Sequence, residues 1–192
     1  MFVDWDTARR VVQPDVRRGR GARVERAISA IQDHLSRILM QREPRTIFRV
    51  TMRVYHGWHQ GRTATEDRRE FDEFLRSFRV RAVERVSFEP DIKYGDELLC
   101  NSRRGRLLDT LRRREDGKYE QKMVDTSLVS DVLHHARSKD GDLIVVVGDD
   151  DDLLPGVFTA EAWGAPILVA RLRNHDNSHL LTEGLIVRLV QT

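Results

Sequence analysis

The sequence predicts an α/β fold in which helices alternate with the strands of a mainly parallel central sheet. Residues 143–147 are five apolar residues in succession, a run typical of a strand that is buried on both faces of a parallel sheet. Segments with helical periodicity separate this strand from the other expected strands. This alternation favours right-handed strand–helix–strand units and a doubly wound sheet.

Four segments carry apolar residues at helical spacing and are expected to be amphipathic helices. The first shows the pattern most fully, because Val24, Ile28, Ile31 and Leu35 fall on one face. The expected helices are residues 22–40, 67–78, 124–136 and 154–163.

The expected strands are short runs rich in β-branched and aromatic residues. They are residues 2–3, 47–55, 80–88 (the expected third strand), 143–147 and 165–172. Residues 180–190 are expected to be a helix or a short strand, and the two alternatives stay open. Residues 89–118 are polar, arginine-rich and weakly periodic, so we expect a long irregular excursion there.

Length and composition predict a single domain over residues 1–192, with enough apolar content, 40%, to bury a sheet between helices. No apolar run approaches the roughly 18–20 residues of a membrane span, and the first residues do not resemble a secretory signal. Cys100 is the single cysteine, which excludes an internal disulfide framework and a multi-cysteine zinc site. We therefore expect a cytoplasmic protein without a membrane partner.

Charged residues make up 33% of the chain, and the two signs are segregated although the net charge is only +2. Basic side chains gather at residues 17–20, 103–106 and 112–114, whereas residues 149–152 are four consecutive aspartates. This separation suits a polyanionic substrate held by arginines while carboxylates bind a cation. The alternative for each cluster taken alone is an ordinary solvated surface.

Aspartates also follow two of the expected strands. Asp4 follows the first strand, and Asp150 and Asp152 follow the strand at 143–147. Ligands of doubly wound sheets bind at the carboxyl ends of the strands. These carboxylates are therefore expected to converge on one edge of the sheet, with Asp6, Asp149 and Asp151 as solvent-facing neighbours.

Three acidic segments resemble, in order and spacing, the motifs of the NYN domain family, a branch of the PIN-like nucleases. They are residues 4–6, residues 121–131 and residues 145–155. The family pattern has a strand ending in aspartate, then Lys-Gly-Val-Asp with a second aspartate six residues on, then Ser-Gly-Asp-x-Asp-Phe-x-Pro. Asp125 and Asp131 keep the six-residue interval, and Asp150, Asp152 and Pro155 keep the interval of the last motif.

The chain departs from the family pattern at several positions beside the aspartates. Thr7 stands where asparagine is common, Met123 replaces the glycine, Gly148 replaces the serine and Leu153 replaces the phenylalanine. Near the end, Gly184 and Leu185 stand where an Ala-Asp pair is usual. Every core aspartate is retained.

The resemblance implies a three-layer α/β/α, Rossmann-like (PIN-like) domain that acts as a metal-dependent endoribonuclease. Mg²⁺ or Mn²⁺ would be held by Asp4, Asp125, Asp150 and Asp152, with Asp131 as an outer ligand. One or two such ions activate water and stabilise charge on a phosphodiester. Hard divalent cations prefer carboxylate and water oxygens, which explains why aspartates are clustered in such a site.

Four basic residues, Lys122, Arg103, Arg104 and Arg106, are expected to contact the phosphates of a single-stranded RNA. A surface lysine at the start of a helix is an equally good interpretation of Lys122. Two other functions stay open: a non-catalytic RNA-binding or regulatory module on the same fold, and a nuclease that acts on DNA in a defence or toxin system. The sequence also leaves open whether the protein forms a homodimer.

Overall fold

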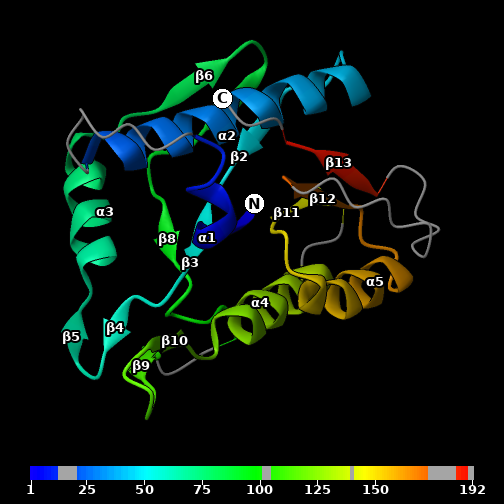
Figure 1. Ribbon diagram of the computed structural model, residues 1–192. Helices are drawn as coiled ribbons and strands as arrows, with labels where there is room; N and C mark the ends of the chain where they lie inside the picture. Colours follow the sequence, from blue (N-terminus) through cyan, green and yellow to red (C-terminus); the bar gives the residue numbers. More distant parts are fainter. Residues whose placement is uncertain (13–20, 101–104, 139–140, 173–184, 190–192) are drawn as a thin grey trace.

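The centre of the molecule is a six-stranded sheet in the order β13-β12-β11-β1-β3-β8 (Figure 1). This computed structural model describes residues 1–12, 21–100, 105–138, 141–172 and 185–189. Every pairing in the central sheet is parallel. The strands are β1 (Phe2–Asp4), β3 (Arg53–Tyr55), β8 (Lys93–Tyr94), β11 (Ile144–Val147), β12 (Ile167–Arg171) and β13 (Ile186–Arg188). The expected α/β class, with a mainly parallel sheet and the strand at 143–147 in its centre, is therefore confirmed.

The order of the strands creates a reversal point between β1 and β11. Counted along the chain, the six strands read 3-2-1-4-5-6 across the sheet. Sheets with this order bind ligands in the crevice outside the strand ends, at the point where the order reverses. Val3 pairs with Val147 in this sheet, so both strands end at the same edge. Asp4 and the loop that begins at Gly148 leave the sheet there.

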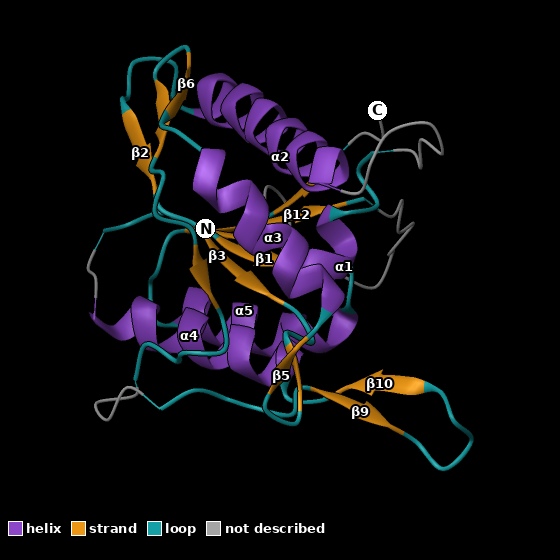
Figure 2. Ribbon diagram, turned by 90° about the vertical axis from the view of Figure 1, so that its left-hand side faces the viewer, coloured by secondary structure: helices purple, strands orange, loops and turns teal. Residues whose placement is uncertain are grey.

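Helices cover both faces of the sheet (Figure 2). On one face lie α1 (Trp5–Ala8), α2 (Gly21–Arg42) and α3 (Glu66–Ser77), and on the other lie α4 (Val124–Ser138) and α5 (Leu154–Ala162). Alternate residues of β11 serve the two layers. Val145 and Val147 pack in the core cluster that contains Ile28, whereas Ile144 and Val146 pack in the cluster that contains Leu128. Burial on both faces explains why this strand is an uninterrupted apolar run.

The strand expected at residues 47–55 is two strands in different sheets. Strand β2 (Phe48–Val50) pairs with β7 (Val86–Phe88) in a separate three-stranded sheet that also contains β6 (Arg81–Val83). Only the second half, β3, enters the central sheet. The single third strand expected at residues 80–88 is also two strands, β6 and β7, which form an antiparallel hairpin outside the central sheet.

Residues 89–118 contain more regular structure than their composition indicates. They include β8, which is the edge strand beyond β3, and most of a hairpin made by β9 (Leu111–Arg113) and β10 (Tyr119–Gln121). A two-residue edge strand is too short to show a periodic pattern, so sequence reasoning could not find β8. A second short hairpin, β4 (His59–Gln60) with β5 (Thr63–Ala64), follows β3. At the other end of the chain, β13 decides the open alternative at residues 180–190 in favour of a strand for residues 186–188.

The 22-residue helix α2 is amphipathic rather than apolar throughout. It buries Ile28, Ile31 and Leu35 against the sheet while charged residues such as Arg37 are exposed. In the part of the chain that the structure describes, no helix combines the length and the apolar character needed to cross a membrane.

Met123, at the junction of β10 and α4, provides a test of local backbone strain because its φ of 66° lies in the left-handed region. An L-residue in this conformation costs roughly 1–2 kcal/mol, and a β-branched side chain tolerates it least. We expect the free energy of unfolding of Met123→Gly to exceed that of Met123→Val by at least about 1 kcal/mol. Urea denaturation of the two variants measures this difference. Equal stabilities would contradict the assigned strain.

Candidate active site

An acidic cavity lies where β1 and β11 end. Its volume is about 360 Å³. The residues that line it are Asp4, Asp6, Arg10, Gln121, Asp125, Asp149, Asp150 and Asp151. Three of the four expected metal ligands, from segments far apart in the sequence, therefore face one cavity at the reversal point of the sheet.

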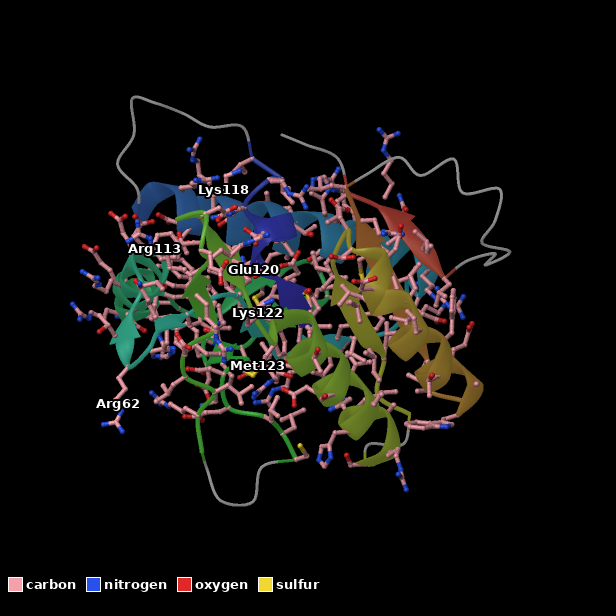
Figure 3. The ribbon with its side chains drawn as sticks, turned by 60° about the horizontal axis from the view of Figure 1, so that its bottom comes forward. Arg62, Arg113, Lys118, Glu120, Lys122 and Met123 are labelled. Atoms are coloured by element: carbon pink, nitrogen blue, oxygen red, sulfur yellow. The ribbon has the colours of Figure 1, made fainter. Side chains whose placement is uncertain are left out.

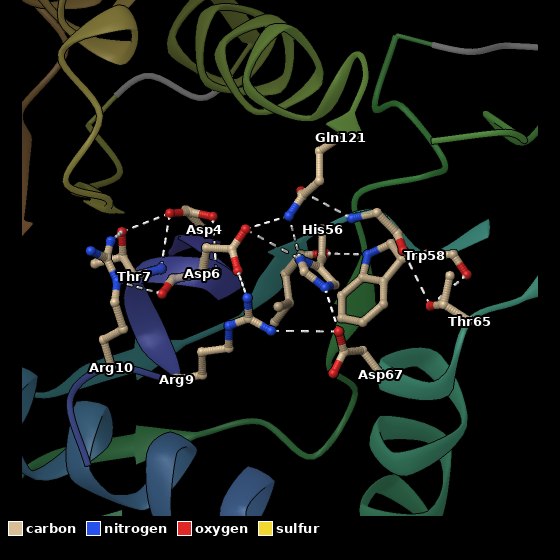
Figure 4. Close-up of polar contacts among 12 residues, drawn as sticks. Asp4, Asp6, Thr7, Arg9, Arg10, His56, Trp58, Thr65, Asp67 and Gln121 are labelled. Carbon is tan, nitrogen blue, oxygen red and sulfur yellow. Dashed lines mark hydrogen bonds and ion pairs between the residues drawn. The ribbon is translucent and has the colours of Figure 1, made fainter. Parts of the chain in front are cut away.

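Asp4 ends β1 and caps the short helix α1. Its carboxylate accepts hydrogen bonds from the backbone of Asp6 at 3.1 Å and from the backbone and hydroxyl of Thr7 at 3.0 and 2.6 Å (Figure 4). Burial raises the pKa of Asp4, the nearby Asp6 carboxylate adds to this effect, and the bonds from Thr7 oppose it. The side chain is thus nearly buried and held in one orientation.

The loop after β11 brings the aspartate run to the cavity in two different environments. Asp150 is exposed, and its side chain caps the short 3-10 helix Asp151–Leu153 by accepting the backbone N–H of Asp152 at 3.0 Å. Asp149 was expected to face solvent, but it is only 3% exposed. Its carboxylate accepts the backbone N–H of Leu172 at 2.7 Å and lies 3.3 Å from the Arg10 guanidinium.

Asp125, in the first turn of α4, has a pKa that reports the negative charge of the site. Its pKa is raised to about 6, first by burial and then by the negative charges of Asp4, Asp150, Asp152 and Asp6. Asp152 is therefore close enough to act on Asp125, although it is not among the residues that line the cavity. Like charges that converge in this way are unfavourable unless a proton or a cation compensates them.

The donor set fits a hard divalent cation better than a softer metal. Six of the described residues that line the cavity are aspartates, the others are Arg10 and Gln121, and none is a cysteine or histidine. Within the described ranges, no three His, Cys, Asp or Glu side chains are grouped so that they could hold a metal ion. Mg²⁺ is usually bound by only one or two protein carboxylates together with waters and substrate phosphates, so this geometry still suits it.

Asp131, which the motif spacing suggested as an outer ligand, is fully buried and does not line the cavity. Its carboxylate accepts hydrogen bonds from the Tyr55 hydroxyl at 2.7 Å, the Arg53 Nε at 3.1 Å and the Leu99 backbone at 2.7 Å. It therefore joins β3, α4 and the segment after β8. This is the bonding of a structural carboxylate.

Lys122 and Arg106, two of the four basic residues expected to contact substrate, are not among the described residues that line the cavity. Lys122 is exposed and pairs with Glu120 at 2.8 Å, and Arg106 is exposed and pairs with Glu97 at 2.6 Å. Arg103 and Arg104 lie outside the described residues.

A polar network beside Asp6 escaped sequence reasoning (Figure 4). The Gln121 amide nitrogen donates to the Asp6 carboxylate and lies 3.1 Å from Nδ1 of His56, while its oxygen accepts the backbone N–H of Gly57 at 3.1 Å. The other ring nitrogen of His56 lies 2.7 Å from Asp67, and this hydrogen bond is the main cause of the lowered pKa of Asp67. The bonds are consistent with the tautomer in which Nδ1 accepts and Nε2 donates. No sequence spacing links these residues, since tertiary packing alone brings them together.

Arg10 is another residue of the site that the sequence did not single out. It is the one basic residue that lines the cavity in the described part of the chain. Its guanidinium lies 3.3 Å from both Asp149 and the Thr7 hydroxyl, and its Nε donates to the backbone oxygen of Asp6 at 2.8 Å. The cavity therefore contains one positively charged side chain close to its carboxylates.

Comparison of the chain with protein-family models, with curated proteins and with solved structures found no match. The fold and the site define a doubly wound α/β domain with an acidic cavity at the reversal point of its sheet.

The bonding of Asp131 predicts a large effect on stability. Asp131→Ala would leave Arg53 and Tyr55 without their shared acceptor, and removing one partner of a buried ion pair costs about 3–5 kcal/mol. Asp91→Ala is the control, because Asp91 is exposed and a surface pair with Lys93 contributes at most about 1 kcal/mol. Chemical denaturation checks both values, and a loss in Asp131→Ala no larger than in the control would contradict the structural role.

The raised pKa of Asp125 predicts that the cluster destabilises the fold at neutral pH when no divalent cation is present. The folded protein binds a proton on Asp125 up to about pH 6, whereas the unfolded chain releases it near the ordinary aspartate pKa of 3.8. Stability should therefore fall as the pH rises from about 4 to about 6. Asp125→Asn should flatten this fall and be more stable than the wild type at pH 7. Thermal unfolding in EDTA measures both, with Asp91→Asn as the control that should keep the wild-type slope.

Proposed function

We propose that the chain is a metal-dependent endoribonuclease that hydrolyses phosphodiester bonds of single-stranded RNA. The observation that carries the proposal is the convergence of Asp4, Asp125 and Asp150 on one cavity at the reversal point of the sheet. Burial and the charges of the clustered carboxylates together raise the pKa of Asp125 to about 6, which is the environment expected of a site that binds a divalent cation.

We further propose that the domain is a three-layer, PIN-like member of the NYN group. Helices on both faces of a parallel sheet support this assignment. So does the backbone at Met123, which occupies the glycine position of the second motif and has a φ of 66°, where glycine is favoured. Two other departures from the family pattern are neighbours in space. A Cβ on Gly148 would lie 2.5 Å from Cδ1 of Leu153, so these two replacements suit each other.

The residues of the cavity have separable roles in this proposal. One or two of Asp4, Asp125 and Asp150 would hold Mg²⁺ or Mn²⁺ together with water and substrate oxygens, with Asp152 close by. The bound ion would supply an activated water and neutralise charge on the phosphate. Thr7 keeps the Asp4 carboxylate in place through its backbone and hydroxyl bonds. The Arg10 guanidinium is a candidate partner for a phosphate oxygen, since planar guanidinium groups match phosphate geometry.

Substitution of Asp150 tests the proposal. Asp150→Asn removes a ligand charge with little change in volume, and the side chain is exposed, so folding should be retained. We expect cleavage of a labelled single-stranded RNA in Mn²⁺ or Mg²⁺ to fall by about 100-fold or more, the scale of losing one electrostatic stabiliser of a transition state. EDTA should abolish cleavage by the wild type.

A matched control and a second substrate separate the alternatives. Asp91→Asn removes an exposed carboxylate elsewhere on the chain and should cleave like the wild type. Single-stranded DNA of the same sequence distinguishes a ribonuclease from a DNA nuclease. RNA binding without cleavage by the wild type in either metal would reject the enzyme and favour a non-catalytic RNA-binding module.

A further inference from the structure

The β9–β10 hairpin starts at the wall of the acidic cavity and projects away from the body of the domain (Figure 2). Its base is tightly held. Gln121 lines the cavity and accepts the Gly57 backbone N–H, and a Cβ on Gly57 would lie 3.2 Å from Cβ of Leu111. The preceding turn is fixed by Asp109, whose carboxylate accepts the backbone N–H of Gly61 at 2.9 Å. The base of the hairpin is therefore fixed to the wall of the cavity.

Strand register divides the hairpin into two faces. Gln121 pairs with Leu111, and Tyr119 pairs with Arg113. Directly paired residues point to the same face of an antiparallel ladder, and residues two apart along a strand share that face. Arg113 and Tyr119 thus continue the face that begins with Gln121 at the cavity, at a further distance of about 7 Å along the strand. We call this pair the outer hairpin face.

The opposite face carries more basic residues, but they are largely neutralised within the hairpin. Arg112 lies 2.9 Å from Asp109, and Lys122 lies 2.8 Å from Glu120. Figure 3 labels Arg113, Glu120 and Lys122 along the hairpin. A cation already paired with a carboxylate has less to gain from a phosphate, because that carboxylate repels the phosphate.

The outer hairpin face combines a cation with an exposed aromatic ring. Tyr119 is 55% exposed, so its ring is open to solvent. Arg113 is exposed, and its Nε donates to the backbone oxygen of Gly117 at 3.3 Å rather than to a carboxylate. An aromatic platform beside a cation is the arrangement by which proteins bind single-stranded nucleic acid, since every base has a face that can stack and every nucleotide a phosphate.

We propose that the outer hairpin face binds a single-stranded nucleic acid that extends from the cavity, with one base stacked on Tyr119 and a phosphate contacted by Arg113. This inference rests on the proposed function, because it assumes that the cavity receives a nucleic acid. It assigns substrate binding to residues of the ordered hairpin in place of Arg106, which is paired with Glu97.

Binding of a fluorescein-labelled 12-nucleotide oligouridylate in EDTA, followed by fluorescence anisotropy, tests the proposal without cleavage. Arg113→Ala and Arg112→Ala remove the same charge from the two faces of one hairpin. We expect Arg113→Ala to make the slope of log affinity against log salt shallower by about 0.7, the value for one phosphate contact on a single strand. Arg112→Ala should leave the slope unchanged. Equal effects of the two substitutions would overturn the proposed face.

Tyr119 provides a second, independent comparison. Tyr119→Ala should weaken binding by about tenfold, within the range measured for loss of one base–aromatic stack, whereas Tyr119→Phe keeps the ring and should bind like the wild type. A blunt-ended RNA duplex, whose bases are already stacked, should show no difference between the two variants. If Tyr119→Phe binds as weakly as Tyr119→Ala, or if the chain does not bind the oligouridylate, the stacking role is wrong.

The same proteins separate failure of this inference from failure of the proposed function. Cleavage by the wild type in Mn²⁺, together with unchanged binding by Arg113→Ala and Tyr119→Ala, would reject the hairpin and retain the nuclease. Hairpin-dependent binding without any cleavage would retain the binding face and reject the nuclease. Stacking on Tyr119 would serve RNA and DNA alike. The affinity for DNA of the equivalent sequence therefore shows which of the two strands the protein prefers. Thermal unfolding confirms that each variant is folded.

Discussion

The parallel pairing of β1 with β11 is the constraint on which the site depends. It aligns Val3 with Val147, so that Asp4 and the loop after β11 leave the sheet at one edge. A single hydroxyl then joins the two chain segments: Thr7 Oγ1 donates to the Asp4 carboxylate at 2.6 Å and accepts the backbone N–H of Asp149 at 3.0 Å. Without this register, carboxylates 146 positions apart along the chain, Asp4 and Asp150, would not share a cavity.

The carboxylates of this region divide into two groups with opposite physical roles. Asp131 and Asp149 are buried and matched by donors, so their charges are compensated within the protein. Asp125, by contrast, meets other carboxylates and has its pKa raised to about 6 by burial and by their charge. Uncompensated like charges at the carboxyl ends of the strands destabilise the fold. Groups with pKa values perturbed in this way concentrate at functional sites. The electrostatics, more than the number of aspartates, distinguish the cavity from an acidic surface loop.

The hairpin gives the same domain a feature that its acidic motifs do not explain. Gln121 belongs at once to the cavity wall, to the network of His56 and Asp67, and to β10. A movement of the hairpin would therefore disturb the groups around Asp6. This connection ties a surface arm to the interior of the site through hydrogen bonds rather than through an apolar core.

Long periodic elements could be predicted from the sequence, whereas short elements and their partners could not. The helices near residues 22–40 and 124–136 and the buried strand at 143–147 appear close to the expected bounds as α2, α4 and β11. The helices repeat apolar side chains at helical spacing, and the strand is one continuous apolar run, so both signals are local. The run at 47–55 was expected to be one strand, but it divides between two sheets because β2 pairs with β7 and β3 pairs with β1. That choice depends on residues far away in the sequence.

The sequence by itself determined which carboxylates stand at the ends of the strands, because a buried apolar run followed by aspartates is a local signal. Only the tertiary structure decided their environments. It buried Asp131 beneath Tyr55 and Arg53 and tied Asp149 to Leu172. The reason is physical: the burial and charge around a side chain are set by neighbours from other elements, and the spacing along one segment does not contain them.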